Sequence, residues 1–113
     1  MQHRDMVTLK KILVAINEAT EILENVSKDD FLKNTTQKLA MAMSIIRVGE
    51  LVKTLTDEFR KQTSQVPWRD ITGFRDIAAH KYDIVDMNEV YKTIKYEFPE
   101  LKAQIEKILA NEF

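Results

Sequence analysis

The sequence predicts an all-α domain, an antiparallel up-and-down bundle of four main helices plus a short helix. Three observations indicate this class. Apolar residues recur at three- and four-residue steps, no segment alternates with the two-residue period of a strand, and the 113 residues include only 2 Gly and 2 Pro. So few turn residues are not typical of sandwiches, barrels or propellers. The length suits one domain, residues 1–113.

A first amphipathic helix is predicted from about Met6 to Val26, where apolar positions at helical spacing oppose a charged face. Ser27 then suits the N-cap of a short helix, and Asp29 and Asp30 suit the positive end of that helix. We expect the polar run 34–36 to end the short helix, because no apolar contact continues through it.

A longer helix is predicted from about Thr36 to Lys61. The side chains expected on its buried face are Leu39, Met43, Ile46, Val52, Leu55 and Phe59. Gly49 lies inside this helix, where glycine costs about 1 kcal/mol relative to alanine. We therefore expect a neighbouring helix to approach closely at Gly49.

The next helix is predicted from Pro67 to His80 or Tyr82, because proline fits the first turn, where its missing N–H costs nothing. Asp86 suits the start of a last helical stretch, in which Pro99 predicts a kink or a break. The aromatic and thioether side chains expected in the core are Trp68, Phe74, Met41, Met43 and Met87.

Composition limits the function classes. The 17 Lys and Arg against 18 Asp and Glu give a net charge of -1, whereas proteins that bind long duplex DNA usually carry a basic excess. The absence of cysteine excludes thiolate metal sites and cysteine nucleophiles, and His3 and His80 lie far apart in sequence. We expect no metal and no cofactor. No apolar run approaches the roughly 20 residues of a membrane span, and no signal peptide is recognisable, so we expect a cytoplasmic protein.

Residues 68–82 contain the densest set of side chains capable of chemistry. Asp76 and His80 are four apart, so on a helix the carboxylate could fix the imidazole tautomer. Arg75 offers donors for a phosphate, and His80 can transfer a proton, which together suit metal-free attack of an RNA 2′-hydroxyl on the adjacent phosphate. Arg75 and His80 are about 140° apart around a helix, so a helix end or a second subunit would have to bring them together.

The same residues also admit a purely structural interpretation. An Arg-Asp-x3-His pattern on a helix is most often a solvated charged face with one hydrogen-bonded histidine, and Tyr82 alone is typical of a half-buried aromatic. Residue types by themselves leave both interpretations open.

Residues 75–82, Arg-Asp-Ile-Ala-Ala-His-Lys-Tyr, resemble the R-x4-H-x-Y signature of HEPN domains, in particular the HepT-like branch. Residues 45–50, 67–74 and 98–102 resemble further segments of that branch in the same order, so the resemblance covers essentially the whole chain. It implies a helical bundle that forms a symmetric homodimer with its R-x4-H motifs facing across a cleft.

The resemblance also implies an activity and partners. HepT-like members are metal-independent endoribonuclease toxins of type VII toxin–antitoxin pairs, and tRNA is the expected RNA. The partner is an MntA-like nucleotidyltransferase, which silences the toxin by placing AMP on the motif tyrosine. Carried over by position, Arg75 and His80 are the catalytic pair, Asp76 fills the polar position after the arginine, and Tyr82 is the AMP acceptor. We expect Asp76 to orient His80, and we expect RNA phosphate to be contacted by Arg75, Lys81 and Arg47.

Three positions depart from the family pattern, and two other functions remain open. Asp76 stands where many members have Asn, and Arg47 and Val48 depart from the usual apolar-plus-Gly pattern before Glu50. Arg47 either faces the cleft or is simply solvated. The first alternative function is a non-catalytic nucleotide- or substrate-binding partner subunit of a minimal nucleotidyltransferase. The second is a helical dimer used for assembly. The intact R-x4-H-x-Y motif favours the ribonuclease.

Overall fold

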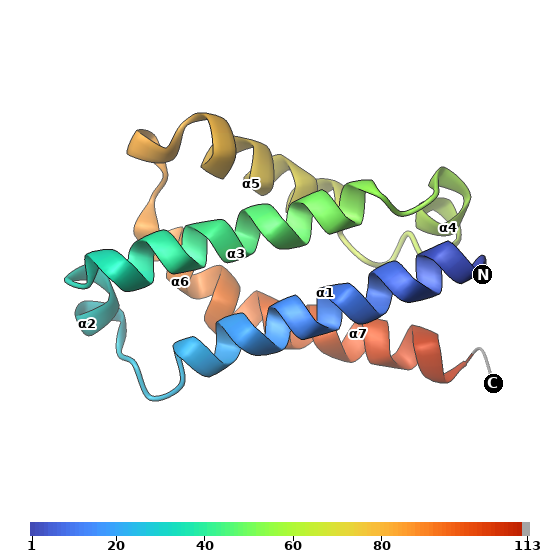
Figure 1. The fold of residues 1–113 in the computed structure, drawn as a ribbon, viewed down its shortest axis with the longest axis horizontal. Helices are drawn as coiled ribbons and strands as arrows, with labels where there is room; N and C mark the ends of the chain where they lie inside the picture. Colours follow the sequence, from blue (N-terminus) through green and yellow to red (C-terminus); the bar gives the residue numbers. More distant parts are fainter. Residues whose placement is uncertain (112–113) are drawn as a thin grey trace.

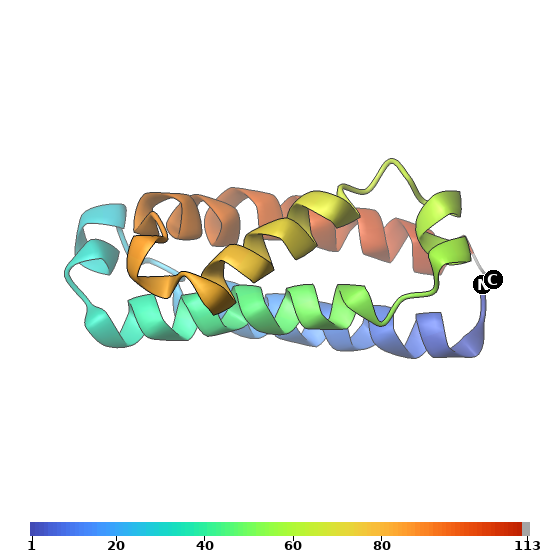
Figure 2. The same ribbon diagram turned by 90° about the horizontal axis from the view of Figure 1, so that it is seen from above.

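The computed structural model describes residues 1–111, which contain helices and no strand. The long helices are α1 (His3–Ile22), α3 (Thr35–Lys53), α5 (Trp68–His80) and α7 (Phe98–Ala110). The short ones, α2 (Lys28–Leu32), α4 (Asp57–Gln62) and α6 (Met87–Lys92), lie towards the ends of the bundle (Figure 1). Seen from above, α5 packs on α3 and crosses the bundle diagonally (Figure 2). The predicted all-α bundle is confirmed.

The core lies between α1, α3 and the continuous helical run that leads from α6 into α7. Its fully buried large side chains include Leu9, Ile12, Ile16, Phe31, Met41, Val48, Ile94 and Ile105. Each side chain of this size contributes about 1.5–3 kcal/mol when it is removed from water. Trp68 is buried as predicted, and its indole N–H donates to the Thr63 hydroxyl at 3.0 Å.

Side-chain caps fix several helix starts. The Ser27 hydroxyl accepts from the Asp30 N–H at 3.1 Å, and the Asp86 carboxylate accepts from the Asn88 N–H at 2.9 Å, which confirms both predicted starts. The single predicted helix over 36–61 is wrong, because α3 ends at Lys53 and the Thr56 hydroxyl caps a separate helix, α4. The first helix also begins and ends earlier than predicted, at His3–Ile22.

The predicted buried face of the long helix is wrong at two positions. Leu39 is 52% exposed and Met43 is 61% exposed, so Met43 is not a core residue. The residues of α3 that are buried are Met41, Ala42, Ile45, Val48, Gly49 and Val52. Apolar side chains occur on two sides of α3, and the neighbouring helices cover only one of them, which periodicity alone could not identify.

The Pro99 region distorts the last helical run without breaking it. A π-helical segment, η2 (Thr93–Glu97), joins α6 to α7, and the Phe98 N–H donates to the Thr93 carbonyl five residues back. Proline has no N–H for the carbonyl four residues before it, and a wider turn is one way to accommodate that loss. The predicted kink therefore takes the form of a π turn.

Candidate functional site

The candidate site is built where α5 crosses α3. A Cβ atom placed on Gly49 would lie 2.2 Å from Arg75 Cβ and 2.5 Å from Arg75 Cγ, distances that real side chains do not reach. Gly49 therefore lets the stem of Arg75 lie directly against the backbone of α3. The predicted close approach of a neighbouring helix at Gly49 is confirmed, and the neighbour is the helix that carries the arginine.

Two carboxylates hold the Arg75 guanidinium. Nη2 forms a close ion pair with Oε1 of Glu50, and Nη1 donates to Oδ1 of Asp76 at 3.0 Å. The Arg75 side chain is only 17% exposed. Its Nε is buried and has no hydrogen-bond partner within residues 1–111. The guanidinium thus sits at a fixed place with its charge balanced by Glu50 and Asp76, and its Nε donor is unused.

The Asp76 carboxylate forms a hydrogen bond with a residue of α3. Its Oδ1 accepts from Lys53 Nζ at 2.7 Å as well as from Arg75. The hydrogen bond from Lys53 and then that from Arg75 lower the pKa of the Asp76 carboxyl from its usual 3.8. Across the described chain, Asp76 makes no hydrogen bond to His80. The expected orienting contact is therefore not formed in the single chain, where Lys53 and Arg75 both donate to Oδ1.

His80 is the last residue of α5 and is exposed. Its imidazole has no hydrogen bond to any part of the chain between residues 1 and 111. Because α5 is continuous from Trp68 to His80, Arg75 and His80 stay about 140° apart around the helix axis. A single chain does not bring the two side chains onto one face.

Lys81 and Tyr82 follow directly after the helix. The backbone leaves the helical region at Lys81, with φ -137° and ψ 43°, and Tyr82 begins the 3-10 turn η1 (Tyr82–Ile84). Tyr82 is 36% exposed, and its hydroxyl makes no hydrogen bond within the described part of the chain. Both side chains are therefore accessible to a ligand or to a modifying enzyme.

Arg47 lies on α3 but is paired with a different helix. Its Nη1 is 2.6 Å from Oε2 of Glu18 on α1, and both side chains are about half exposed. The structure thus gives Arg47 a surface ion pair, of the kind that contributes about 0–1 kcal/mol.

Sequence reasoning missed Glu50 and Lys53, which position Arg75 and Asp76. The signal in the sequence was Gly49 followed directly by Glu50. A glycine inside a helix indicates a close helix crossing, and a side chain next to the crossing can reach the neighbouring helix. Among the described residues, no three His, Asp or Glu side chains converge in a way that could hold a metal ion. None of the described helices is long and apolar enough to cross a membrane.

The sequence is similar to a described protein family and to several known proteins. A family model described as "Ribonuclease HepT-like" matches residues 12–108. A protein of Caldanaerobacter subterraneus subsp. tengcongensis, provisionally named an RNase, is 38% identical over 104 residues, 92% of this chain and 93% of that protein. A Methanocaldococcus jannaschii protein, also provisionally named an RNase, is 32% identical over 110 residues, 96% of this chain and 91% of its own length.

A third relative carries a more specific name. A Thermococcus cleftensis protein, provisionally named ribonuclease HepT, is 31% identical over 103 residues, which are 88% of this chain and 94% of that protein. No solved structure gives a significant match. The matched residues include all of α3 and α5, and therefore the whole of the candidate site.

Proposed function

Because the chain belongs to the HepT-like ribonuclease family, we propose that it is an endoribonuclease that cleaves RNA with Arg75 and His80. One observation carries the assignment of these residues. Arg75 is held at the Gly49 crossing, about one and a half turns before an exposed histidine on the same helix. A fixed cation and an accessible proton-transfer group are what phosphodiester cleavage needs.

The proposed reaction is an internal transesterification without a metal ion. His80 removes the proton of a ribose 2′-hydroxyl, and the 2′-oxygen forms a bond to the adjacent phosphorus. The bond from phosphorus to the 5′-oxygen breaks, and the protonated His80 gives its proton to the leaving oxygen. The products are a 2′,3′-cyclic phosphate and a 5′-hydroxyl. Arg75 stabilises the negative charge that builds up on the phosphoryl oxygens, with Lys81 as a further phosphate contact.

We propose that the working form is a symmetric homodimer. Within one chain Arg75 and His80 point to different sides of α5, so two copies facing each other would complete the site. Exposed apolar side chains on the two helices of the site support this arrangement: Leu39 and Met43 on α3 and Ile77 on α5 are 52%, 61% and 47% exposed. Covering them is favourable.

We further propose that the protein is the toxin of a toxin–antitoxin pair whose partner is an MntA-like nucleotidyltransferase, with tRNA as the RNA substrate. The exposed Tyr82 hydroxyl supports a modification site beside His80. In that transfer the phenol oxygen bonds to the α-phosphorus of ATP, pyrophosphate leaves, and the phenol proton goes to a base. An AMP group there would place bulk and negative charge where RNA phosphate has to bind.

The chemistry of the cut tests the proposed reaction. The purified protein is incubated with a short RNA in buffer containing EDTA, and with the same RNA carrying a 2′-deoxyribose at the cut position. Cleavage in EDTA, a 2′,3′-cyclic phosphate end, and resistance of the deoxy-substituted RNA are expected. Cleavage of the deoxy-substituted RNA, or a complete requirement for a divalent metal ion, would contradict the proposed mechanism.

A second candidate function has one observation in its favour. Both Nη atoms of Arg75 are already paired with Glu50 and Asp76, which is also what a structural or nucleotide-binding arginine would show. The second candidate is a non-catalytic nucleotide-binding partner subunit of a nucleotidyltransferase. It predicts intact RNA in the same assay, together with ATP binding that is lost in Arg75→Ala.

A further inference from the structure

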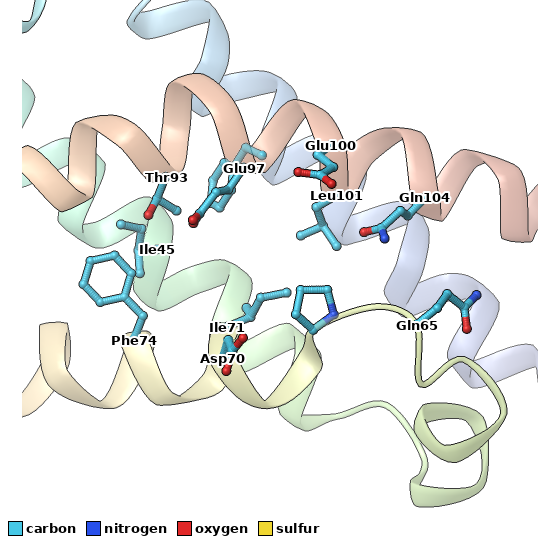
Figure 3. Close-up of a pocket in the computed structure, with 12 residues that line it drawn as sticks. Ile45, Gln65, Asp70, Ile71, Phe74, Thr93, Glu97, Glu100, Leu101 and Gln104 are labelled. Carbon is cyan, nitrogen blue, oxygen red and sulfur yellow. The ribbon is translucent and has the colours of Figure 1, made fainter.

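A groove lies between α5 and α7. Its volume is about 360 Å³. Apolar side chains of three helices line part of it: Ile45 of α3, Ile71 and Phe74 of α5, and Leu101 of α7. Figure 3 shows side chains of α5 and of the η2–α7 run pointing towards one another across this space. We call it the α5–α7 groove.

The rim of the α5–α7 groove is acidic. Asp70 lies on the α5 side, and Glu97 and Glu100 lie on the opposite side (Figure 3). No lysine, arginine or histidine is among the residues that line the groove. Within residues 1–111, none of these three carboxylates forms an ion pair. The three carboxylates thus have no ion-pair partner among the described residues, although Asp70 also borders a second hollow that is lined by Arg60, Lys61 and Arg69.

The helix on one side of the groove is irregular at this place. The π-helical segment Thr93–Glu97 supplies both Thr93 and Glu97 to the lining, and Phe98 follows directly. π turns are rare, and they occur frequently at functional sites. Here the wide turn is where Glu97 is added to the rim.

We propose that the α5–α7 groove docks a segment of a partner protein that presents one or two apolar side chains flanked by lysine or arginine. The apolar part of the lining would take the apolar side chains, and the three rim carboxylates would face the flanking cations. RNA does not fit the charge of the rim, because its phosphates would meet three carboxylates. The volume is at the lower end of the roughly 300–1,000 Å³ of ligand pockets, which suits an anchor side chain better than a whole cofactor.

This assignment does not depend on the ribonuclease reaction, and binding can be measured directly. The probes are fluorescein-labelled peptides with capped ends and the sequence pattern Lys-Lys-Phe-Leu-Lys-Lys, with Phe-Leu varied to Leu-Leu and Ile-Leu. Two control peptides replace either the lysines by glutamates or the apolar pair by Ser-Ser. Binding to the full chain is followed by fluorescence polarisation, and the binding surface is mapped by amide chemical shifts in ¹⁵N-labelled protein.

Two variants that remove the same number of negative charges distinguish binding in the groove from a general effect of net charge. The test variant is Asp70→Asn/Glu97→Gln/Glu100→Gln, and the control variant is Glu21→Gln/Glu24→Gln/Asp29→Asn, whose exposed residues do not line the groove. We expect the test variant to weaken binding of the basic apolar peptides by at least about tenfold, with the control variant within about twofold of the unaltered protein. We also expect the largest changes in amide chemical shift on peptide binding at Phe74, Thr93 and Gln104.

Four results would overturn the proposal. The first is that no peptide of the basic apolar pattern binds. The second is equal weakening by the two triple variants, which would mean that only net charge matters. The third is equal binding of the Ser-Ser peptide, which would make the groove a site for cations alone. The fourth is self-association of the unaltered protein that the test variant abolishes, which would show a second copy of the chain in the groove.

Discussion

At the residue scale, the site depends on a position that has no side chain. Gly49 allows Arg75 to lie against α3, and Glu50, the next residue, then pairs with the guanidinium. The sequence predicted a close approach at Gly49 and placed Arg75 and His80 on one helix, because helical spacing and proline rules are local. It could not predict that Glu50 and Lys53 would hold Arg75 and Asp76, because those contacts depend on which faces of α3 and α5 meet.

Replacing Gly49 with alanine tests this contact. Gly49→Ala would gain about 1 kcal/mol of helix propensity, but the new methyl would overlap Arg75, and overpacking of this kind costs about 1–3 kcal/mol. We expect a net loss of stability in urea unfolding and a displaced Arg75.

Gly73→Ala is the matched control, because a Cβ there meets nothing within 4 Å. We expect this exposed helical position to gain up to about 1 kcal/mol. Equal stabilisation by the two substitutions would contradict the close approach.

The ionisation of Asp76 gives a prediction about pH. Its carboxyl pKa is lowered by the hydrogen bond from Lys53 and then by that from Arg75, so the ionised form is the one stabilised by folding. A lowered pKa contributes stability that is fully present above the ordinary value of 3.8 and is lost as the pH falls through the lower folded value. The unaltered protein should therefore exceed Asp76→Asn in urea midpoint at neutral pH, and the gap should close below pH 3.8. A gap that stays constant into that acidic range would contradict the network.

At the element scale, helix ends could be predicted where a cap residue precedes a clear apolar pattern. They were missed where tertiary contacts determine the position at which the helix ends. Ser27 and Asp86 cap as their sequences indicate. The end of α3 was missed because apolar spacing continues through Leu55 and Phe59, while the break is fixed by Asp5 from the other end of the chain. The buried Asp5 carboxylate accepts hydrogen bonds from the Thr56 N–H at 2.8 Å and from the Thr56 hydroxyl at 2.7 Å.

Removing that carboxylate should loosen the junction between α1 and α4. Asp5→Ala leaves the Thr56 N–H without its partner, which costs about 1–3 kcal/mol when the group is buried. We expect a lower midpoint in thermal or urea unfolding, whereas Asp83→Ala, at an exposed position, should change stability by less than about 0.5 kcal/mol. Similar effects of the two substitutions would show that Asp5 does not hold the junction.

At the scale of the whole molecule, charge is arranged locally and not as a basic surface. Arg75 is balanced by two carboxylates, Arg47 by Glu18, and the α5–α7 groove is acidic. Under the proposed function, we expect RNA to contact the end of α5, where His80, Lys81 and Tyr82 are exposed. The sequence could place these residues next to each other, but it could not show that one chain leaves Arg75 and His80 on different sides of α5.

The proposed modification belongs to this scale, because it joins the protein to a partner. With an MntA-like nucleotidyltransferase and ATP, mass spectrometry should detect AMP on the unaltered protein and on Tyr96→Phe, but not on Tyr82→Phe. Tyr96 is the matched control because it is 68% exposed and lies on another helical segment. Modification of Tyr82→Phe at the unaltered rate would contradict Tyr82 as the acceptor.

The most direct test of the central claim is the rate of RNA cleavage by four single variants. His80→Ala and Arg75→Ala remove the proposed catalytic pair, and His3→Ala and Arg69→Ala remove an exposed histidine and an exposed arginine elsewhere. We predict that His80→Ala and Arg75→Ala each lower the rate by about 10²–10⁴-fold, the usual contribution of a proton-transfer group or of a charge that stabilises the transition state. His3→Ala and Arg69→Ala should cleave at the unaltered rate. Full activity of a folded His80→Ala protein would contradict the assignment.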